Sequence, residues 1–317
     1  MRAPWRALLR HETVLALLIV AVLLVLAQQS DRFFTAENLL NQGRLSAELG
    51  LISLTMTFVI VTGGIDLSVG SILGLGAIMV GVFWKNVGLP LPLAMVLAVG
   101  VGGLCGLGNG LIITRFRVPP LIATLATLAL YRGLAEGISQ SRSVRGYPEW
   151  FFHLGQGDTA GVPTQVWILL LVAVAAAVIL GRTTFGRATY ALGANETAAR
   201  FSGVAVDRTK LLIYTASGLA SGLAAVIFVS RVSTTRSDMG TGLELDAVTA
   251  VVLGGTSIFG GRGTIVGTVL GLVLIQALRN GLALAGVKGD GTIVVIGAIL
   301  ILAILVSNFL GRDGDGQ

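Results

Sequence analysis

The chain has 317 residues, of which 54% are hydrophobic and only 12% are Asp, Glu, Lys or Arg. Soluble domains carry about twice that share of charge, and the mean hydropathy of +0.87 indicates a membrane protein that crosses the bilayer many times. The net charge of +6 comes from arginines scattered over the loops, and without a basic stripe a role in nucleic-acid binding has no support.

Apolar windows long enough to cross a bilayer, which takes about 17–25 helical residues, recur along the whole chain. They predict an all-α polytopic protein with about ten transmembrane helices, of which the second and the eighth are the ones expected to be tilted or broken. The windows are 13–28, 46–62, 69–84, 91–113, 120–137, 165–181, 209–229, 244–258, 264–284 and 291–310.

The first window follows three arginines, Arg2, Arg6 and Arg10, and therefore resembles a secretory signal with a cleavage site before Gln28. The alternative is an uncleaved first span with its basic end in the cytoplasm, which suits a chain with many later spans. An even number of spans then places both termini in the cytoplasm, with 311–317 as a tail. The basic segments 114–120 and 182–210 also fall inside, as the positive-inside rule prefers.

The sequence VTGGIDLSVGS, residues 61–71, interrupts an otherwise apolar region. Gly63 and Gly64 weaken a helix, Asp66 is expected to cap the next helix by accepting N–H bonds, and Ser68 adds a hydroxyl group. The segment is either a capped turn between two spans or a broken helix that lines a substrate pathway. The two interpretations are compatible.

Residues 182–210 form a cytoplasmic segment too long for a simple helix–helix turn. Asn195 is suited to be an N-cap, Glu196 favours the first turn of a helix, and Gly203 favours its end. A short helix at the cytoplasmic surface could contact another protein. The alternative is a solvated loop with one helical turn.

The sequence SDMGTGLELDAV, residues 237–248, places acidic residues at the outer end of the eighth window. Asp238, Glu244 and Asp246 are expected to hydrogen-bond to a docked partner or to an entering substrate. A solvated acidic cluster at the edge of the membrane is the alternative.

Four sequence blocks resemble the membrane permease subunits of ATP-binding-cassette sugar importers of the ribose, rhamnose and autoinducer-2 type. They are VTGGIDLSVGS, PPLIATLATLALYRGLA (119–135), TTFGRATYALGANETAARFSGV (183–204) and ELDAVTAVVLGGTSIFGGRGT (244–264). The resemblance implies one permease domain over 1–317 in the cytoplasmic (inner) membrane. It also implies three protein partners: a second permease chain, identical or related, an extracytoplasmic substrate-binding protein, and a cytoplasmic ATPase with two nucleotide-binding domains.

The same resemblance implies that the segment 182–210 couples the chain to the ATPase. Thr197, Ala198, Ala199 and Gly203 match the importer pattern of Glu-Ala-Ala, three residues, then Gly, with Thr197 in place of the glutamate. Gly186, Asn195 and Glu196 belong to the same block. The substrate pathway is expected between the two permease chains, and its candidate residues are Gly63, Gly64, Asp66, Ser68, Glu244 and Asp246.

Catalysis by the chain itself has no motif to support it. The sequence lacks a G-x-x-x-x-G-K-[ST] phosphate loop, so ATP and Mg²⁺ are expected on a partner and no cofactor on this chain. His11, His153 and the single Cys105 lie far apart and form no metal-ligand pattern. Two alternatives remain open: an ion-coupled secondary transporter or channel that uses Asp66, and a permease of the branched-chain amino-acid type.

Overall fold

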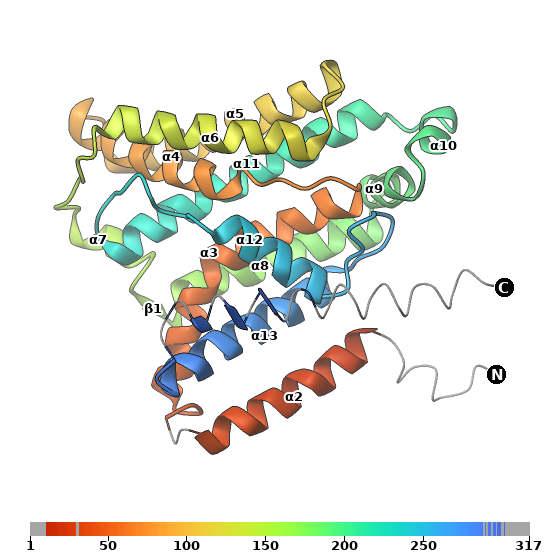
Figure 1. Cartoon of the computed structure of the whole chain (residues 1–317). Coiled ribbons are helices and arrows are strands. Elements are labelled where there is room, and N and C mark those ends of the chain that lie inside the picture. The colour runs from red at the N-terminus through yellow and green to blue at the C-terminus, as the bar shows by residue number, and fades with distance from the viewer. Residues whose placement is uncertain are drawn as a thin grey trace.

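The computed structural model describes residues 11–29, 32–287 and isolated positions between 289 and 301. Within them the chain folds into an all-α bundle with one two-stranded ribbon (Figure 1). One end of the bundle carries α10 and the other carries α7, and we call these the α10 end and the α7 end. The elements are α2 (His11–Gln29), α3 (Ala36–Val61), α4 (Val69–Gly81), a π-helical turn (Val82–Asn86), α5 (Leu91–Arg115), α6 (Pro120–Ser139), α7 (Glu149–Phe152), β1 (Asp158–Thr159), β2 (Val162–Pro163), α8 (Thr164–Arg182), α9 (Thr184–Ala194), α10 (Glu196–Phe201), α11 (Val206–Val232), α12 (Leu243–Leu253) and α13 (Ile265–Leu284).

Seven helices of the described chain are long and apolar enough to cross a membrane: α3, α4 with its π-helical turn, α5, α6, α8, α11 and α13. A shorter apolar stretch, Leu15–Leu26, lies in α2. The eighth predicted span is the 11-residue helix α12, whose length of about 17 Å is too short to cross a bilayer. The tenth predicted span, 291–310, falls mostly outside the described residues. The chain is therefore an all-α multi-pass membrane protein.

Helix boundaries follow local signals in the sequence. Thr35, Thr183 and Thr264 are the N-caps of α3, α9 and α13, and each side-chain oxygen accepts a backbone N–H from the first turn. α6 begins at Pro120 directly after Pro119, where a missing N–H costs nothing. These caps place the helix ends where the chain changes direction.

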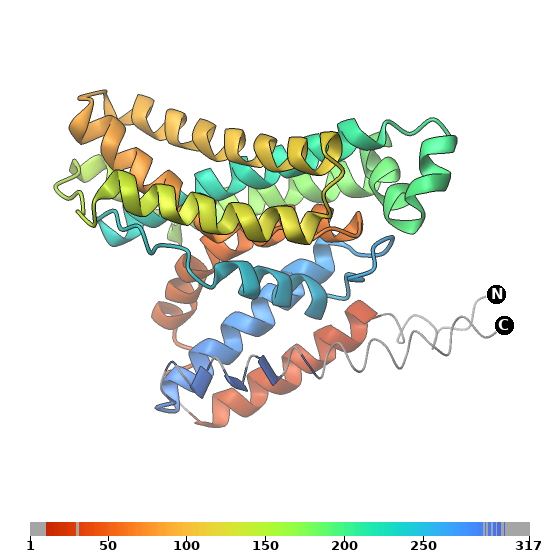
Figure 2. The same cartoon turned by 45° about the horizontal axis from the view of Figure 1, so that its top comes forward.

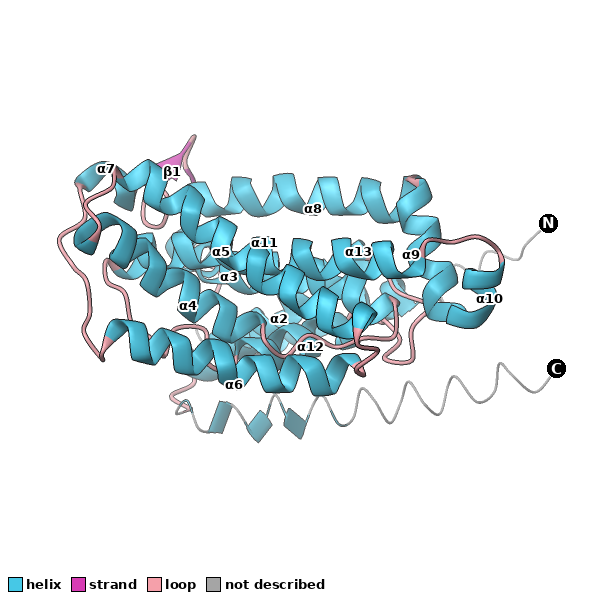
Figure 3. Cartoon of the chain, turned by 90° about the horizontal axis from the view of Figure 1, so that it is seen from above, coloured by secondary structure: helices cyan, strands magenta, loops and turns pink. Residues whose placement is uncertain are grey.

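The centre of the bundle is formed by α3 and α11, with α4, α5, α12 and α13 packed around them. In the view from above, α8 and α6 lie on opposite sides (Figure 3). Three glycines of α5 form a packing surface against α11: a Cβ at Gly102 or Gly106 would collide with α11 backbone, and one at Gly110 would lie 3.1 Å from the Leu211 Cα.

The two short helices, α4 and α12, begin inside the bundle and run to opposite ends. The chain reaches α4 from the α10 end through residues 62–68, and reaches α12 from the α7 end through residues 233–242 (Figure 2). Their first turns meet: a Cβ added at Gly70 would collide with both the Gly240 carbonyl oxygen and the Glu244 carboxylate. Two helix beginnings at the middle of a membrane bundle resemble the broken helices that transporters place at their binding sites.

Candidate functional site

Residues 62–68, which we call the break, separate α3 from α4. Gly63 has φ of +78°, a conformation that favours glycine, and Gly64 leaves room for Tyr214, whose Oη would lie 2.5 Å from a Cβ at position 64. Gly63 N–H donates to Ile60 O at 2.8 Å and Gly64 N–H to Val59 O at 3.1 Å. The two glycines therefore end α3 and let the chain turn back into the bundle.

The Asp66 carboxylate is fully buried in the break. Its Oδ1 accepts the Ser68 backbone N–H at 3.0 Å and the Ser68 hydroxyl at 2.6 Å, and its Oδ2 accepts the Ser217 hydroxyl of α11 at 2.9 Å. The predicted cap differs in position: Ser68 is the N-cap of α4 and its side chain makes no capping hydrogen bond, and the N–H that Asp66 accepts is that of Ser68 itself. Asp66 instead closes a local turn just ahead of the helix and fastens it to α11.

A polar network continues from Ser68 to two further helices. The Asn109 amide of α5 donates to the Ser68 Oγ at 2.7 Å, and the Tyr131 hydroxyl of α6 donates to the Asn109 Oδ1 at 3.2 Å. Thr124 of α6 donates to the Ile65 carbonyl at 3.0 Å. Asn109, Tyr131 and Ser217 were missed by the sequence analysis, although a lone amide in the apolar stretch 91–113 was a usable signal.

Asp66, Ser68 and Asn109 of this network are fully buried in the part of the chain that the structure describes. Of the four candidate pathway residues in the break, only Gly63 is exposed. These buried polar side chains are hydrogen-bonded to one another, and their bonds set the shape of the break. A direct contact between these residues and a substrate stays a prediction.

The three acidic residues of 237–248 do not form one cluster. Glu244 stands at the start of α12, where its Oε1 accepts the Gly242 N–H at 3.2 Å and its buried Oε2 has no hydrogen-bond partner. Asp246 faces α13 and is paired with Arg279 at 2.5 Å, while the exposed Asp238 is paired with Arg236. The alternative of one solvated acidic cluster is therefore wrong, and the expected contact with a docked partner or a substrate stays a prediction.

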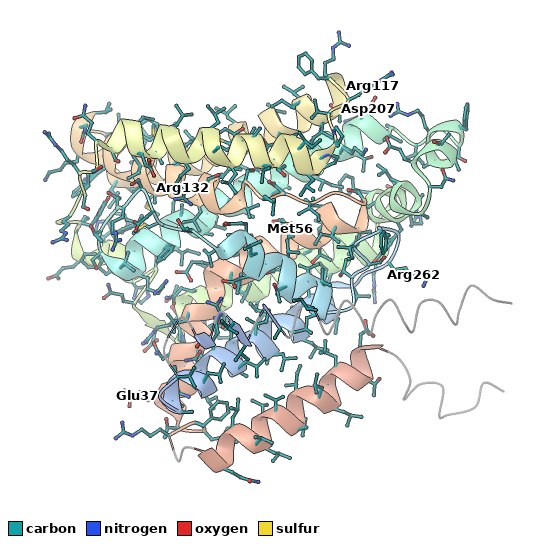
Figure 4. The ribbon with its side chains drawn as sticks, viewed as in Figure 1. Glu37, Met56, Arg117, Arg132, Asp207 and Arg262 are labelled. Carbon is teal, nitrogen blue, oxygen red and sulfur yellow. The ribbon has the colours of Figure 1, made fainter. Side chains whose placement is uncertain are left out.

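Arg132 of α6 (Figure 4) connects α4 to residues 233–242, the segment that leads into α12. Its guanidinium donates to the carbonyls of Ser237 and of Met239, the latter at 2.9 Å, and to the Gly70 carbonyl at 3.3 Å. These bonds bring Glu244 next to Gly70, which lies in the first turn of α4, two residues after Ser68. The break and the start of α12 form one site, and Asp246 lies outside it.

The short helix predicted after Asn195 is confirmed as α10, with both of its ends as expected. Asn195 Oδ1 accepts the Ala198 N–H at 2.9 Å, as an N-cap does. At the other end Gly203 has φ of +83°, and Gly203 and Val204 donate to the carbonyls of Arg200 and Ala199 at 3.1 and 3.0 Å. This pair of bonds is the usual glycine-dependent helix ending.

Ion pairs fix α10 to the first two turns of α11. Glu196 is 2.7 Å from the Lys210 Nζ, and Arg200 is 2.7 Å from Asp207. Hydrogen bonds to Asp207, together with its negative charge, raise the pKa of Arg200. Glu196 therefore serves as an internal brace, and α10 is a supported projection at the end of the bundle (Figure 1).

The exposed surface of α10 differs from the expected one. Thr197 and Ala198 are exposed, but Ala199 is only 5% exposed and packs inside the chain, so it offers no surface to a partner. Phe201, which the sequence analysis missed, is 89% exposed. A phenylalanine in a short polar helix was the signal for it. Gly186 lies at the corner between α8 and α9, where a Cβ would collide with the Leu180 carbonyl.

Metal ligands are not gathered anywhere in the part of the chain that the structure describes: no group of three or more His, Cys, Asp or Glu side chains is close enough to hold an ion. The site therefore consists of a buried polar network at the break, the start of α12 beside it, and a projecting helix at one end of the bundle. This combination defines a multi-pass helical membrane protein of the transporter type.

Comparison with known proteins gives the family. The chain belongs to the family described as branched-chain amino acid transport system / permease component, which matches residues 38–304. It is 40% identical over 309 residues to the ribose import permease protein of Escherichia coli, covering 95% of this chain and 94% of that one. It is 42% identical over 294 residues to the Bacillus subtilis ribose import permease protein, covering 92% and 90%.

The chain is also 36% identical over 300 residues to an autoinducer 2 import system permease protein of Escherichia coli, covering 93% of this chain and 91% of the relative. All three relatives are named as permease proteins of import systems. No solved structure matches the chain.

Proposed function

We propose that the chain is the membrane permease subunit of an ATP-binding-cassette importer that carries a monosaccharide or a similar small polyol across the cytoplasmic membrane. The observation that supports this proposal most directly is the 40% identity to a ribose import permease over 95% of the chain. The description of the family names branched-chain amino acids, but the relatives named here import ribose and autoinducer 2, which favours a sugar.

The α10 end then faces the cytoplasm and receives the ATPase, which binds ATP and Mg²⁺. Two observations support this orientation. Arg117 and Arg262 lie toward this end (Figure 4), as the positive-inside rule prefers, and the supported helix α10 projects from it. The substrate-binding protein would dock at the α7 end, and a second permease chain would complete the pathway.

Phe201 is the residue of α10 best suited to hold the ATPase. Its ring is exposed, and the helix under it is fixed by the pairs Glu196–Lys210 and Arg200–Asp207. Burying such a side chain in an apolar cleft contributes about 1.5–3 kcal/mol. Because α10 is already ordered by these pairs, little conformational entropy is lost when it binds.

The test is reconstitution in proteoliposomes with the cognate ATPase and a ribose-loaded binding protein, with radiolabelled ribose as the probe. We expect uptake that requires both ATP and the ATPase, and ATP hydrolysis that the loaded binding protein stimulates. Uptake driven by an ion gradient in the absence of the ATPase would contradict the proposal and favour the secondary transporter. Uptake of leucine in place of ribose would favour the branched-chain amino-acid type.

A further inference from the structure

Three backbone segments from distant parts of the sequence meet at the α10 end. They are Gly193 in α9, residues 61–63 where α3 passes into the break, and the pair Gly260–Gly261 in the loop between α12 and α13. The Gly261 N–H donates to the Val61 carbonyl at 2.8 Å. We call this meeting point the glycine junction.

At Gly193 and at Gly260 the glycine junction leaves no space for a side chain. A Cβ at Gly193 would collide with the Val61 carbonyl oxygen and would lie 2.5 Å from the Gly261 nitrogen. A Cβ at Gly260 would lie 2.9 Å from the Gly193 oxygen and 2.9 Å from the Gly63 nitrogen. All of these neighbours are backbone atoms, which cannot rotate away as the end of a flexible side chain does.

The segments that meet here lead to the two halves of the candidate site. The chain runs from Val61 directly into the break, which Asp66 fastens to α11 at 2.9 Å. The loop with Gly260 and Gly261 begins where α12 ends, and Tyr190 of α9 also donates to its Gly263 carbonyl at 2.6 Å. α9 itself is joined to α10 through the single residue Asn195.

We propose that Gly193 is a positioning residue through which the ATPase-bound segment, α9 with α10, moves the break and the α12–α13 loop. The inference rests on the proposed function. Closely packed backbones transmit displacement because the interior is nearly incompressible. The glycine junction therefore moves as one body, and a shift of α9 changes the position of the break.

Gly193→Ala tests this, with Gly181→Ala as the matched control. Both glycines lie in helices close to the α10 end, but a Cβ at Gly181 would meet no atom within 4 Å. We expect Gly193→Ala to assemble with the ATPase and to retain the basal ATP hydrolysis of the partner. Stimulation by the loaded binding protein and ribose uptake should both fall about tenfold, within the usual range of coupling between sites.

The Gly181→Ala control should keep assembly, stimulation and uptake at the level of the unmodified protein. Normal stimulation and uptake in Gly193→Ala would overturn the inference while leaving the proposed function intact. If the unmodified chain fails to assemble with any ATPase, the proposed function itself is wrong. The two failures are therefore distinguishable.

A cross-link tests the same inference if Gly193→Ala does not fold. A Cβ at Gly261 would lie 3.5 Å from the Ala194 Cβ, which is within the range for a disulfide. We expect the variant with Ala194→Cys and Gly261→Cys, in a Cys105→Ser background, to show the same uptake before and after diamide oxidises the pair, because the two segments move together. Loss of uptake on oxidation that dithiothreitol reverses would show that they separate during transport, and would overturn the inference.

Discussion

The Asp66 Oδ2 accepts a hydrogen bond from the Ser217 hydroxyl at 2.9 Å, across 151 positions of the sequence. It joins the break to the middle of α11, one of the two central helices. With the two bonds from Ser68, the carboxylate has three donors and no exposed surface. A buried carboxylate is tolerated when it is hydrogen-bonded in this way, which makes Asp66 a structural centre of the break.

We therefore expect Asp66→Asn to fold and Asp66→Leu to fail. An asparagine keeps an acceptor for Ser68 and offers an amide to the Ser217 oxygen. Leucine leaves the buried donors of Ser68 and Ser217 unpaired, at about 1–3 kcal/mol for each group. Membrane yield and thermal unfolding in detergent measure the difference. Full yield of Asp66→Asn together with abolished uptake would show that the charge itself takes part in transport.

A second prediction concerns Phe201. Phe201→Ala should weaken ATPase binding by about 10- to 150-fold, since loss of about 1.5–3 kcal/mol of burial corresponds to that range. Thermal unfolding of the isolated chain should not change, because the ring makes little contact with the rest of the chain. Surface plasmon resonance with immobilised ATPase measures the affinity.

Phe116→Ala is the control for Phe201, because Phe116 is another exposed phenylalanine and lies between α5 and α6. Its removal should leave ATPase affinity unchanged. If both variants bind the ATPase as the unmodified chain does, the docking surface lies elsewhere. A substitution at Ala199 would not test docking in the same way, because Ala199 is buried and a larger side chain there would disturb α10 itself.

The ends of α10 could be predicted from the sequence because Asn195 and Gly203 act on the backbone within a few residues of themselves. The polar bonds around Asp66 could not, since Asn109 and Ser217 approach it only after α5 and α11 have packed against α4. The same limit applies to α12. Its apolar sequence suited a full span, but the chain enters the bundle irregularly through 233–242 and leaves only 11 residues for the helix.

The buried ion pair between Glu48 and Arg231 gives a third prediction. Glu48 of α3 is almost fully buried, with its Oε1 2.7 Å from the Arg231 Nε and its Oε2 without a hydrogen-bond partner. Arg231→Leu should lower the free energy of unfolding by about 3–5 kcal/mol, because it leaves a buried charge unpaired.

The double variant Glu48→Leu with Arg231→Leu should recover most of this loss, since no charge then remains to be buried. Thermal unfolding of the two single variants and the double variant in one detergent measures the interaction energy. An additive result would mean that the pair contributes nothing beyond the packing of its side chains, such as Arg231 over the Phe228 ring at 4.7 Å.

The last prediction separates an internal role of Glu244 from a role at the outer surface. Glu244 lies inside the bundle beside the start of α4, and its Oε2 has no hydrogen-bond partner. Glu244→Gln removes a partly desolvated charge, so the variant should fold at least as well as the unmodified chain. Uptake should fall about tenfold, equal to a loss of about 1.4 kcal/mol, while affinity for the binding protein should not change.

Asp238→Asn, which alters an exposed residue paired with Arg236, is the control and should keep its uptake. Weaker binding of the binding protein to Glu244→Gln would show that this residue acts at the docking surface, and unchanged uptake would exclude it from the pathway.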